Sequence, residues 1–317
     1  MPRLHSAALA FVLFAGLAAQ TAAAPPGELR IAAVQLSLAP GDLASAAAYV
    51  ARIQGAVRRC LPFAPDLILF PEYTAAFLAL LPYGGLLGKA GSPEQALRHI
   101  LEREPLARNL EDLLLLNSGL AERAVRELFG GLARRYGVAV GAGTWFAAAA
   151  NGGKASLVNR AVIFDERGAQ LYAQDKVFLT PFEQKFLGLC PGRLEEARPF
   201  LLKGRRIVLT ICRDTFFEDW EDRFQGAELW VDLKANGEPF TDQVREGFQL
   251  ALSDRLLDAK IPYGLSLCLT GGLAGLSWEG ESFLAAWDPD LGVRILARAG
   301  SYEGEDILFF TLPAADR

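Results

Sequence analysis

The sequence predicts an α/β domain, and two kinds of segment lead to that prediction. Short, continuously apolar runs at 66–70 and 206–212 are typical of central strands that are covered on both faces. Segments at 42–59 and 242–260 instead place apolar residues at helical spacing. No repeat or low-complexity linker divides the 317 residues, so we interpret the chain as one domain.

The other elements are expected in the following order. A strand at 28–38 comes first, and the region 79–117 has no strand character but contains two short helical stretches. A helix at 120–136 leads into a strand at 138–142. Further strands are predicted at 157–164, 170–178, 227–233, 263–270, 282–287, 293–297 and 307–312. The turn Asp165-Glu166-Arg167-Gly168 joins the first two of these as a hairpin.

The composition argues against several classes of function. A net charge of −5 without a long basic run disfavours nucleic acid as a partner. The two histidines are His5 and His99, and His5 lies in an N-terminal segment that we expect to be removed. A Ser-His-Asp hydrolase or a histidine-rich zinc site would therefore depend on His99. That residue lies in a polar helical stretch and is interpreted as solvated. No Cys-x-x-Cys pair occurs, which also disfavours a cysteine-rich zinc site.

The first 24 residues have the pattern of a secretory signal peptide. A weakly basic start precedes an apolar run at 7–19 and small residues at 20–24. We therefore expect export to the periplasm or the outside, and a mature chain at 25–317 without a stable membrane span. In an oxidising compartment three cysteines could pair, in a combination that the sequence leaves open: Cys60, Cys190 and Cys268.

Three residues with reactive side chains lie at strand ends or interrupt a strand. Glu72 follows a buried strand, Lys176 interrupts the second arm of the hairpin, and Cys212 ends the strand at 206–212. Each has a plainer interpretation when it is taken alone: a solvated loop charge, an exposed lysine and a small buried thiol. Reactive groups in α/β folds, however, gather where the strands end. The three are therefore considered together.

The surroundings of these residues resemble the nitrilase, or carbon–nitrogen hydrolase, superfamily. The resemblance rests on Pro71-Glu72, on 175–183 (DKVFLTPFE), on 211–214 (ICRD), on 226–229 (GAEL) and on the hairpin at 159–168. Each motif is weak alone. In this order, with 36 residues from Lys176 to Cys212, they form a specific pattern that extends over 29–312.

The resemblance implies the four-layer αββα sandwich of that superfamily, with two mixed sheets packed face to face and helices outside. The carbon–nitrogen hydrolase domain would span 25–317. An insertion at about 77–117 is expected because 104 residues separate Glu72 from Lys176, more than is usual in the family. Because this insertion follows Glu72 directly, we expect it to cover the pocket. Pairing of such domains through their helices implies a homodimer or larger assembly.

The resemblance also implies a catalytic triad of Glu72, Lys176 and Cys212 that hydrolyses an amide. Cys212 would attack the carbonyl carbon, Glu72 would transfer protons and Lys176 would stabilise the oxyanion. Water would then cleave the thioester, and no cofactor or metal is implied. The expected partner is a small-molecule, amide-type substrate, whose identity the sequence does not specify.

Three further residues are expected to support the triad. Glu183 lies seven positions after Lys176, one fewer than is common for the second glutamate of the family, and would position substrate or relay protons. Asp214 is interpreted as structural, holding the turn after Cys212. Arg213 replaces an aromatic residue and either meets an acidic group of the substrate or points to solvent.

Alternative functions remain open at the level of sequence. An N-acyltransferase could use the same triad, but membrane-bound lipoprotein acyltransferases with this domain have transmembrane helices that this chain lacks. A catalytically silent, nitrilase-like binding protein is the alternative outside the enzymes, and the complete triad argues against it. Nitrile hydrolysis is less expected because Asp214 looks amidase-like.

Overall fold

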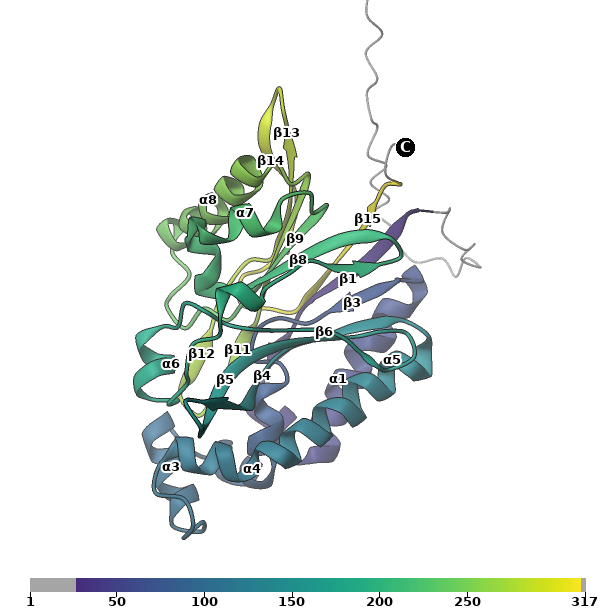
Figure 1. The fold of residues 1–317 in the computed structure, drawn as a ribbon. Helices are drawn as coiled ribbons and strands as arrows, with labels where there is room; N and C mark the ends of the chain where they lie inside the picture. The colour runs from purple at the N-terminus through teal and green to yellow at the C-terminus, as the bar shows by residue number, and fades with distance from the viewer. Residues whose placement is uncertain (1–26, 315–317) are drawn as a thin grey trace, which may run out of the picture.

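The computed structural model describes residues 27–314, so the predicted signal peptide at 1–24 lies outside the described residues. Two six-stranded sheets form its centre (Figure 1). The first contains β15 (Asp306–Leu312), β1 (Leu29–Gln35), β3 (Leu67–Leu69), β4 (Ala139–Asn151), β5 (Lys154–Phe164) and β6 (Gln170–Asp175), in spatial order. The second contains β14 (Gly292–Arg298), β13 (Phe283–Asp288), β10 (Tyr263–Cys268), β9 (Leu229–Lys234), β8 (Arg205–Ile211) and β7 (Phe200–Leu202).

The two large sheets share one apolar core. Ile207 and Leu209 of β8 pack in the same buried cluster as Ile31 of β1 and Leu67 of β3. Val208, between the first two, belongs to a different cluster on the other side of the second sheet. Successive side chains of a strand point to opposite faces, so β8 is buried on both. The continuous apolar run at 206–212 therefore forms a strand, as predicted.

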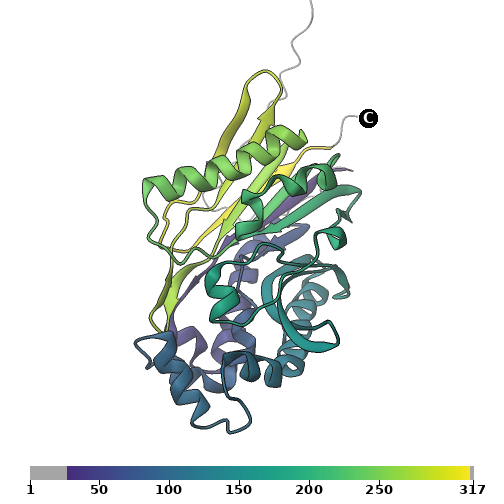
Figure 2. The same cartoon turned by 60° about the vertical axis from the view of Figure 1, so that its left-hand side comes forward.

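Helices pack on the faces of the two sheets that point away from the shared core (Figures 1 and 2). On the first sheet lie α1 (Ala46–Cys60), α4 (Leu110–Val125) and α5 (Gly131–Tyr136), and on the second lie α7 (Glu221–Phe224) and α8 (Asp242–Ala259). Figure 2 shows α8, the long light-green helix, lying across the second sheet. Thr241 caps α8 by accepting a hydrogen bond from Val244 N–H.

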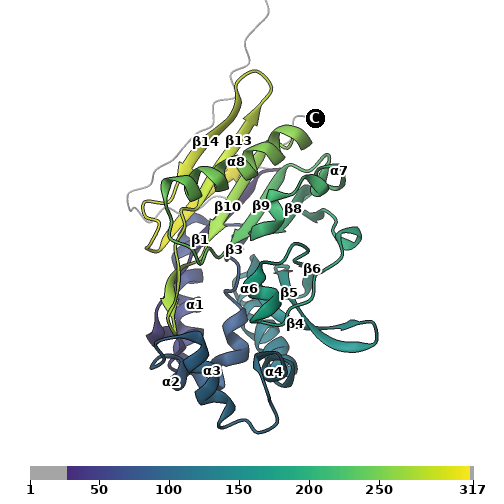
Figure 3. The same ribbon diagram turned by 90° about the vertical axis from the view of Figure 1, so that its left-hand side faces the viewer.

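A group of short elements lies at one end of the sheets (Figure 3). It contains the 3₁₀ segment η3 (Ala76–Tyr83), α2 (Gly84–Leu87), α3 (Pro93–Leu101) and α6 (Pro181–Lys185). A three-stranded sheet of β12 (Leu276–Trp278), β11 (Thr270–Leu273) and β2 (Ser37–Leu38) completes it. This small sheet was not predicted, because its strands are too short to show an alternation of apolar and polar residues.

The predicted boundaries of one helix and of the strand after it were wrong. The helix expected at 120–136 begins already at Leu110, because Asn109 accepts a hydrogen bond from Asp112 N–H and caps α4 there. Helical turns then continue through a π-helical segment, Arg126–Gly130, into α5. The predicted strand at 138–142 is also too short, because β4 continues to Asn151 in antiparallel pairing with β5.

The described residues also test two expectations, about disulfides and about membrane-spanning helices. All four cysteines are free, so none of the disulfides that the sequence left open is present among the described residues. Within residues 27–314, no helix has both the length and the apolar character needed to cross a membrane.

Candidate active site

One cavity of about 700 Å³ brings Glu72, Lys176 and Cys212 together. Glu72 follows β3, Lys176 follows β6 directly, and Cys212 follows β8 directly. All three therefore follow the carboxyl ends of strands, as the sequence predicted for Glu72 and Cys212, whereas Lys176 was expected within a strand. His99 is half-buried on α3 and does not line this cavity.

Close packing of two backbone segments positions Glu72. Gly143, in the bulge of β4, has a φ of 71°, and a Cβ atom there would lie 1.9 Å from the carbonyl oxygen of Pro71. Only glycine leaves room for the strand end that carries Glu72. The next residue, Tyr73, also has a positive φ of 62°, and its N–H donates to Thr144 Oγ1 at 2.8 Å. The backbone on either side of Glu72 is thus fixed, at Pro71 by packing on Gly143 and at Tyr73 by the bond to Thr144.

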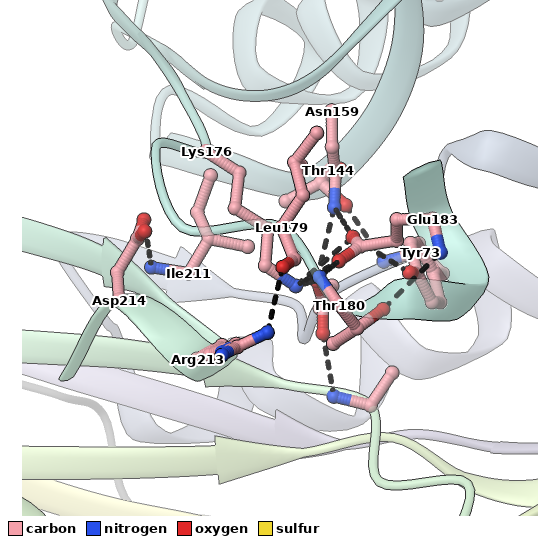
Figure 4. Close-up of polar contacts among 12 residues, drawn as sticks. Tyr73, Thr144, Asn159, Lys176, Leu179, Thr180, Glu183, Ile211, Arg213 and Asp214 are labelled. Atoms are coloured by element: carbon pink, nitrogen blue, oxygen red, sulfur yellow. Dashed lines mark hydrogen bonds and ion pairs between the residues drawn. The ribbon is translucent and has the colours of Figure 1, made fainter. Parts of the chain in front are cut away.

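The carboxylate of Glu72 is 1% exposed, and both of its oxygens accept hydrogen bonds. Oε1 accepts from Lys176 Nζ at 2.9 Å and from Asn159 Nδ2 at 2.9 Å. Oε2 accepts from the backbone N–H of Ala235 at 2.9 Å. These contacts hold the buried carboxylate in one orientation. Figure 4 labels two of the donors, Lys176 and Asn159, together with Glu183.

Glu183 belongs to the same cluster and has a second structural role. Its Oε1 accepts from Lys176 Nζ at 2.9 Å, from Tyr73 Oη at 2.9 Å and from Asn159 Nδ2 at 3.0 Å. Its Oε2 accepts from Thr180 N–H at 2.8 Å, while Thr180 Oγ1 accepts from Glu183 N–H at 3.2 Å. This reciprocal pair is a capping box that begins α6. The cap fixes Glu183 three positions after Thr180, at the start of α6.

Burial and charge move the pKa values of the cluster in different directions. Burial raises the pKa of Glu72 to about 7, against the opposing effect of the Lys176 ammonium. Burial alone would also raise the pKa of Glu183, but Lys176 and the Thr180 N–H outweigh it, and that pKa lies below its usual value. Burial would lower the pKa of Lys176, but Glu72 and the neighbouring charges raise it. Lys176 is therefore charged at neutral pH.

Cys212 begins the turn that follows β8 and has a positive φ of 54°. A non-glycine residue held in this region stores backbone strain, which is common at reactive positions. Burial and the charge of Glu72 raise the pKa of the Cys212 thiol to about 12, although Lys176 and Lys234 oppose the shift. The resting thiol is therefore protonated and needs a base before it can act as a nucleophile.

Asp214 ties the lysine segment to the cysteine turn. Its Oδ1 accepts from the N–H groups of Val177 at 3.1 Å and Phe178 at 2.8 Å, and its Oδ2 accepts from Ile211 N–H at 3.3 Å. The first two bonds take N–H groups that a strand would need. The arm predicted at 170–178 therefore ends at Asp175, which corrects the expected boundary.

The contacts of Arg213 are compatible with both alternatives that the sequence left open. Its Nη1 donates to the carbonyl oxygen of Leu179 at 2.8 Å, and its guanidinium carbon lies 5.8 Å from the ring centroid of Phe217. The residue is exposed and lines the cavity. Arg213 is thus an anchored charge at the cavity wall.

Sequence reasoning missed four participants in this region. Asn159 and Tyr73 bond the two glutamates, as described above, but an isolated amide or phenol in a strand or turn carries no specific signal. Asp232 and Lys234 form a fully buried ion pair on β9, with Nζ 2.5 Å from Oδ2. Two charges at the end of the apolar strand predicted at 227–233 were the available signal for this pair.

The part of the chain that the structure describes contains no group of three or more His, Cys, Asp or Glu side chains arranged to hold a metal ion. The cavity instead gathers a carboxylate, an ammonium and a thiol. Such a set can supply a base, a stabilised negative charge and a nucleophile.

Comparison with known proteins identifies the fold. No protein-family model and no curated protein matches the sequence. The crystal structure of an amidase from Nesterenkonia sp. superposes with a TM-score of 0.63 at 21% identity, covering 93% of this chain and 94% of that one. A variant of the Nesterenkonia AN1 amidase, described as belonging to the nitrilase superfamily, matches with a TM-score of 0.62 at 22% identity, covering 91% and 93%.

A further structure of the Nesterenkonia sp. AN1 amidase carries acrylamide, added by Michael addition at the active-site cysteine. It matches with a TM-score of 0.61 at 22% identity, covering 90% of this chain and 94% of that one. The chain therefore has the α/β fold of nitrilase-superfamily amidases, and the resemblance inferred from the sequence is confirmed at the level of fold.

Proposed function

We propose that this protein hydrolyses a non-peptide carbon–nitrogen bond, an amide, through a thioester on Cys212. The observation that carries the proposal is the buried ion pair between Glu72 and Lys176 in the cavity that Cys212 also lines. The structural neighbours are amidases, and acrylamide is attached to the active-site cysteine in one of them. These likenesses support the same chemistry here.

In the first half of the proposed reaction, Glu72 accepts the thiol proton as Cys212 Sγ bonds to the carbonyl carbon. The Lys176 ammonium, held charged by two carboxylates, stabilises the oxyanion that forms. Glu72 then gives its proton to the departing nitrogen as the carbon–nitrogen bond breaks. The products of this half are an amine, or ammonia, and a thioester.

In the second half, Glu72 takes a proton from water as the water oxygen attacks the thioester carbon. Lys176 again stabilises the oxyanion, and collapse releases the carboxylic acid and returns the proton to Cys212. Glu183 acts as a positioning residue, because it accepts a second hydrogen bond from Lys176 without needing to accept a proton.

We also propose that the layers follow the four-layer αββα order implied by the resemblance. The shared core between the two large sheets and the helices on their other faces support that order. It places the reacting residues at strand ends that are fixed by packing on both sides.

The test is to trap the acyl-enzyme. Protein incubated with a slowly hydrolysed amide should gain the acyl mass on the peptide that contains Cys212, and Cys212→Ala should neither gain it nor turn over substrate. Cys190→Ala is the matched control, because Cys190 is a free cysteine outside the cavity lining. Turnover by Cys212→Ala, or an acyl group on another residue, would refute the mechanism.

A further inference from the structure

Away from the reacting cluster, the walls of the cavity are apolar. The expected insertion contributes Phe77, Leu80, Leu97 and Ile100, and the β11–β12 hairpin contributes Leu273 and Trp278. Charged side chains outside the cluster are limited, among the described residues that line the cavity, to Arg213 and Glu238. These two are exposed and of opposite sign. Outside the cluster, the described lining residues therefore offer no buried charged partner for a substrate group, but a large surface for an apolar one.

Two segments that are distant in sequence close this apolar space. Gly275, between β11 and β12, has a φ of 78°, and a Cβ atom there would lie 2.3 Å from the carbonyl oxygen of Gly91. The hairpin tip thus packs directly on the turn before α3, which Ser92 caps by accepting from Gln95 N–H. Phe77 and Trp278 meet edge to face, with ring centroids 5.7 Å apart. The insertion and the hairpin form one continuous apolar wall.

The size of the cavity also favours a large apolar substrate group. Cavities of roughly 300 to 1,000 Å³ accommodate drug-sized ligands. At about 700 Å³, this one is far larger than a two-carbon amide requires. A small amide would leave most of the apolar wall in contact with water.

The side of the amide bond that carries the apolar group follows from the cluster around Glu72. The leaving nitrogen must reach the Glu72 carboxyl to receive its proton, and this group is 1% exposed and enclosed by Lys176, Asn159 and the Ala235 N–H. These three partners of Glu72 are polar groups, so an apolar nitrogen substituent gains no contact from them. The acyl carbon, in contrast, is bonded to Cys212, whose side chain lines the same cavity as the apolar wall.

We propose that the substrates are amides with a long, uncharged, apolar acyl group and a small nitrogen side. This inference rests on the proposed function and specifies its substrate class. Binding should then improve with each methylene that the wall covers, by about fourfold, until the cavity is filled.

The test is a series of straight-chain primary amides from acetamide to dodecanamide, with kcat/KM measured for each. We expect kcat/KM to rise by about fourfold per methylene over the first several additions. A flat series, or a preference for acetamide, would overturn the substrate class and leave amide hydrolysis standing. N-octylacetamide carries the same chain on nitrogen and should be a poor substrate; if it is preferred over octanamide, the assigned side is wrong.

A pair of variants tests the wall itself. Leu97→Asn places a polar group on the wall and should lower kcat/KM for octanamide at least tenfold more than for acetamide. Leu106→Asn is the matched control, because Leu106 lies in the same insertion, is 79% exposed and does not line the cavity. Equal losses for both substrates in Leu97→Asn would contradict the proposal.

A binding measurement separates the substrate class from the chemistry. In the Cys212→Ala protein, dodecanamide should change the fluorescence of the cavity tryptophan, Trp278, and acetamide at equal concentration should not. If no amide is hydrolysed but dodecanamide still binds with this selectivity, the proposed function fails and the assigned ligand class stands. If dodecanamide does not bind, the ligand class fails.

Discussion

Glu72 and Glu183 share Lys176 and Asn159 as partners, yet their pKa values move in opposite directions. Glu183 adds bonds from the Thr180 N–H and the Tyr73 hydroxyl, which favour its charged form. For Glu72, burial and the charge of Glu183 outweigh the Lys176 ammonium and the Ala235 N–H, so its pKa is raised. Two carboxylates of one cluster can thereby take different roles, one as a base that titrates near neutral pH and one as a permanent charge.

The pH dependence of the reaction should report the pKa of Glu72. Only the ionised carboxylate can accept the thiol proton, and burial raises its pKa to about 7, so the active form is lost as pH falls through that value. On the alkaline side, no loss is expected until the pH approaches the Cys212 pKa of about 12. A profile of kcat/KM for a neutral amide should rise with pH and be half-maximal near 7. A midpoint near the ordinary value of 4.5 would contradict this assignment.

Replacing Lys176 should slow the reaction without removing the nucleophile. Loss of one oxyanion donor typically costs about 10²- to 10³-fold in rate, and we expect Lys176→Met to lower kcat by that factor. Lys185→Met is the control, since Lys185 is exposed on α6. His99→Ala should leave kcat unchanged, and a strong requirement for His99 would argue against the proposed mechanism.

The buried pair of Asp232 and Lys234 should matter for stability. Removing one partner leaves the other charge buried without compensation, which costs about 3–5 kcal/mol in the free energy of unfolding. We therefore expect urea denaturation of Lys234→Met to show a loss of that size. The double variant with Asp232→Leu should lose less than the sum of the single changes. Strictly additive losses would mean that the two side chains do not interact.

At the scale of elements, α6 links local structure to the site. Thr180→Ala removes the side-chain half of the capping box and should cost about 1 kcal/mol in the free energy of unfolding. Because the same box holds Glu183 against Lys176, the variant should also lower kcat. Ser45→Ala removes the cap of the remote helix α1 and should cost similar stability with kcat unchanged. If the two variants had equal kcat values, the cap of α6 would not be needed to position Glu183.

At the scale of the whole molecule, export remains a prediction, because residues 1–24 lie outside the described residues. Their apolar run and small residues predict removal by a signal peptidase. Sequencing of the protein recovered outside the cytoplasm should therefore find an N-terminus between Ala22 and Pro26. An active, soluble protein that retains Met1 would contradict export. The expected homodimer or larger assembly also stays a prediction, which light scattering of the purified protein can test.

The sequence by itself determined two central strands, β3 and β8, and the reactive residues that follow them. Burial on both faces leaves a continuous apolar run, so the strands at 66–70 and 206–212 were predictable, and with them the positions of Glu72 and Cys212. Motif order added Lys176 and Glu183. The helix at 242–260 was equally accessible, because apolar spacing and a threonine cap are local properties.

Only the tertiary structure decided the contacts between these segments. The pairing of β4 with β5, the bonds of Asn159 and Tyr73, and the pair of Asp232 with Lys234 depend on neighbours that no local pattern specifies. The same is true of the apolar wall, where Gly275 at the tip of the β11–β12 hairpin packs on Gly91 in the turn before α3. Local propensity acts over a few residues, whereas long-range packing selects which segments contact one another. The cavity is lined by segments that are distant in sequence, so only the tertiary structure specifies it.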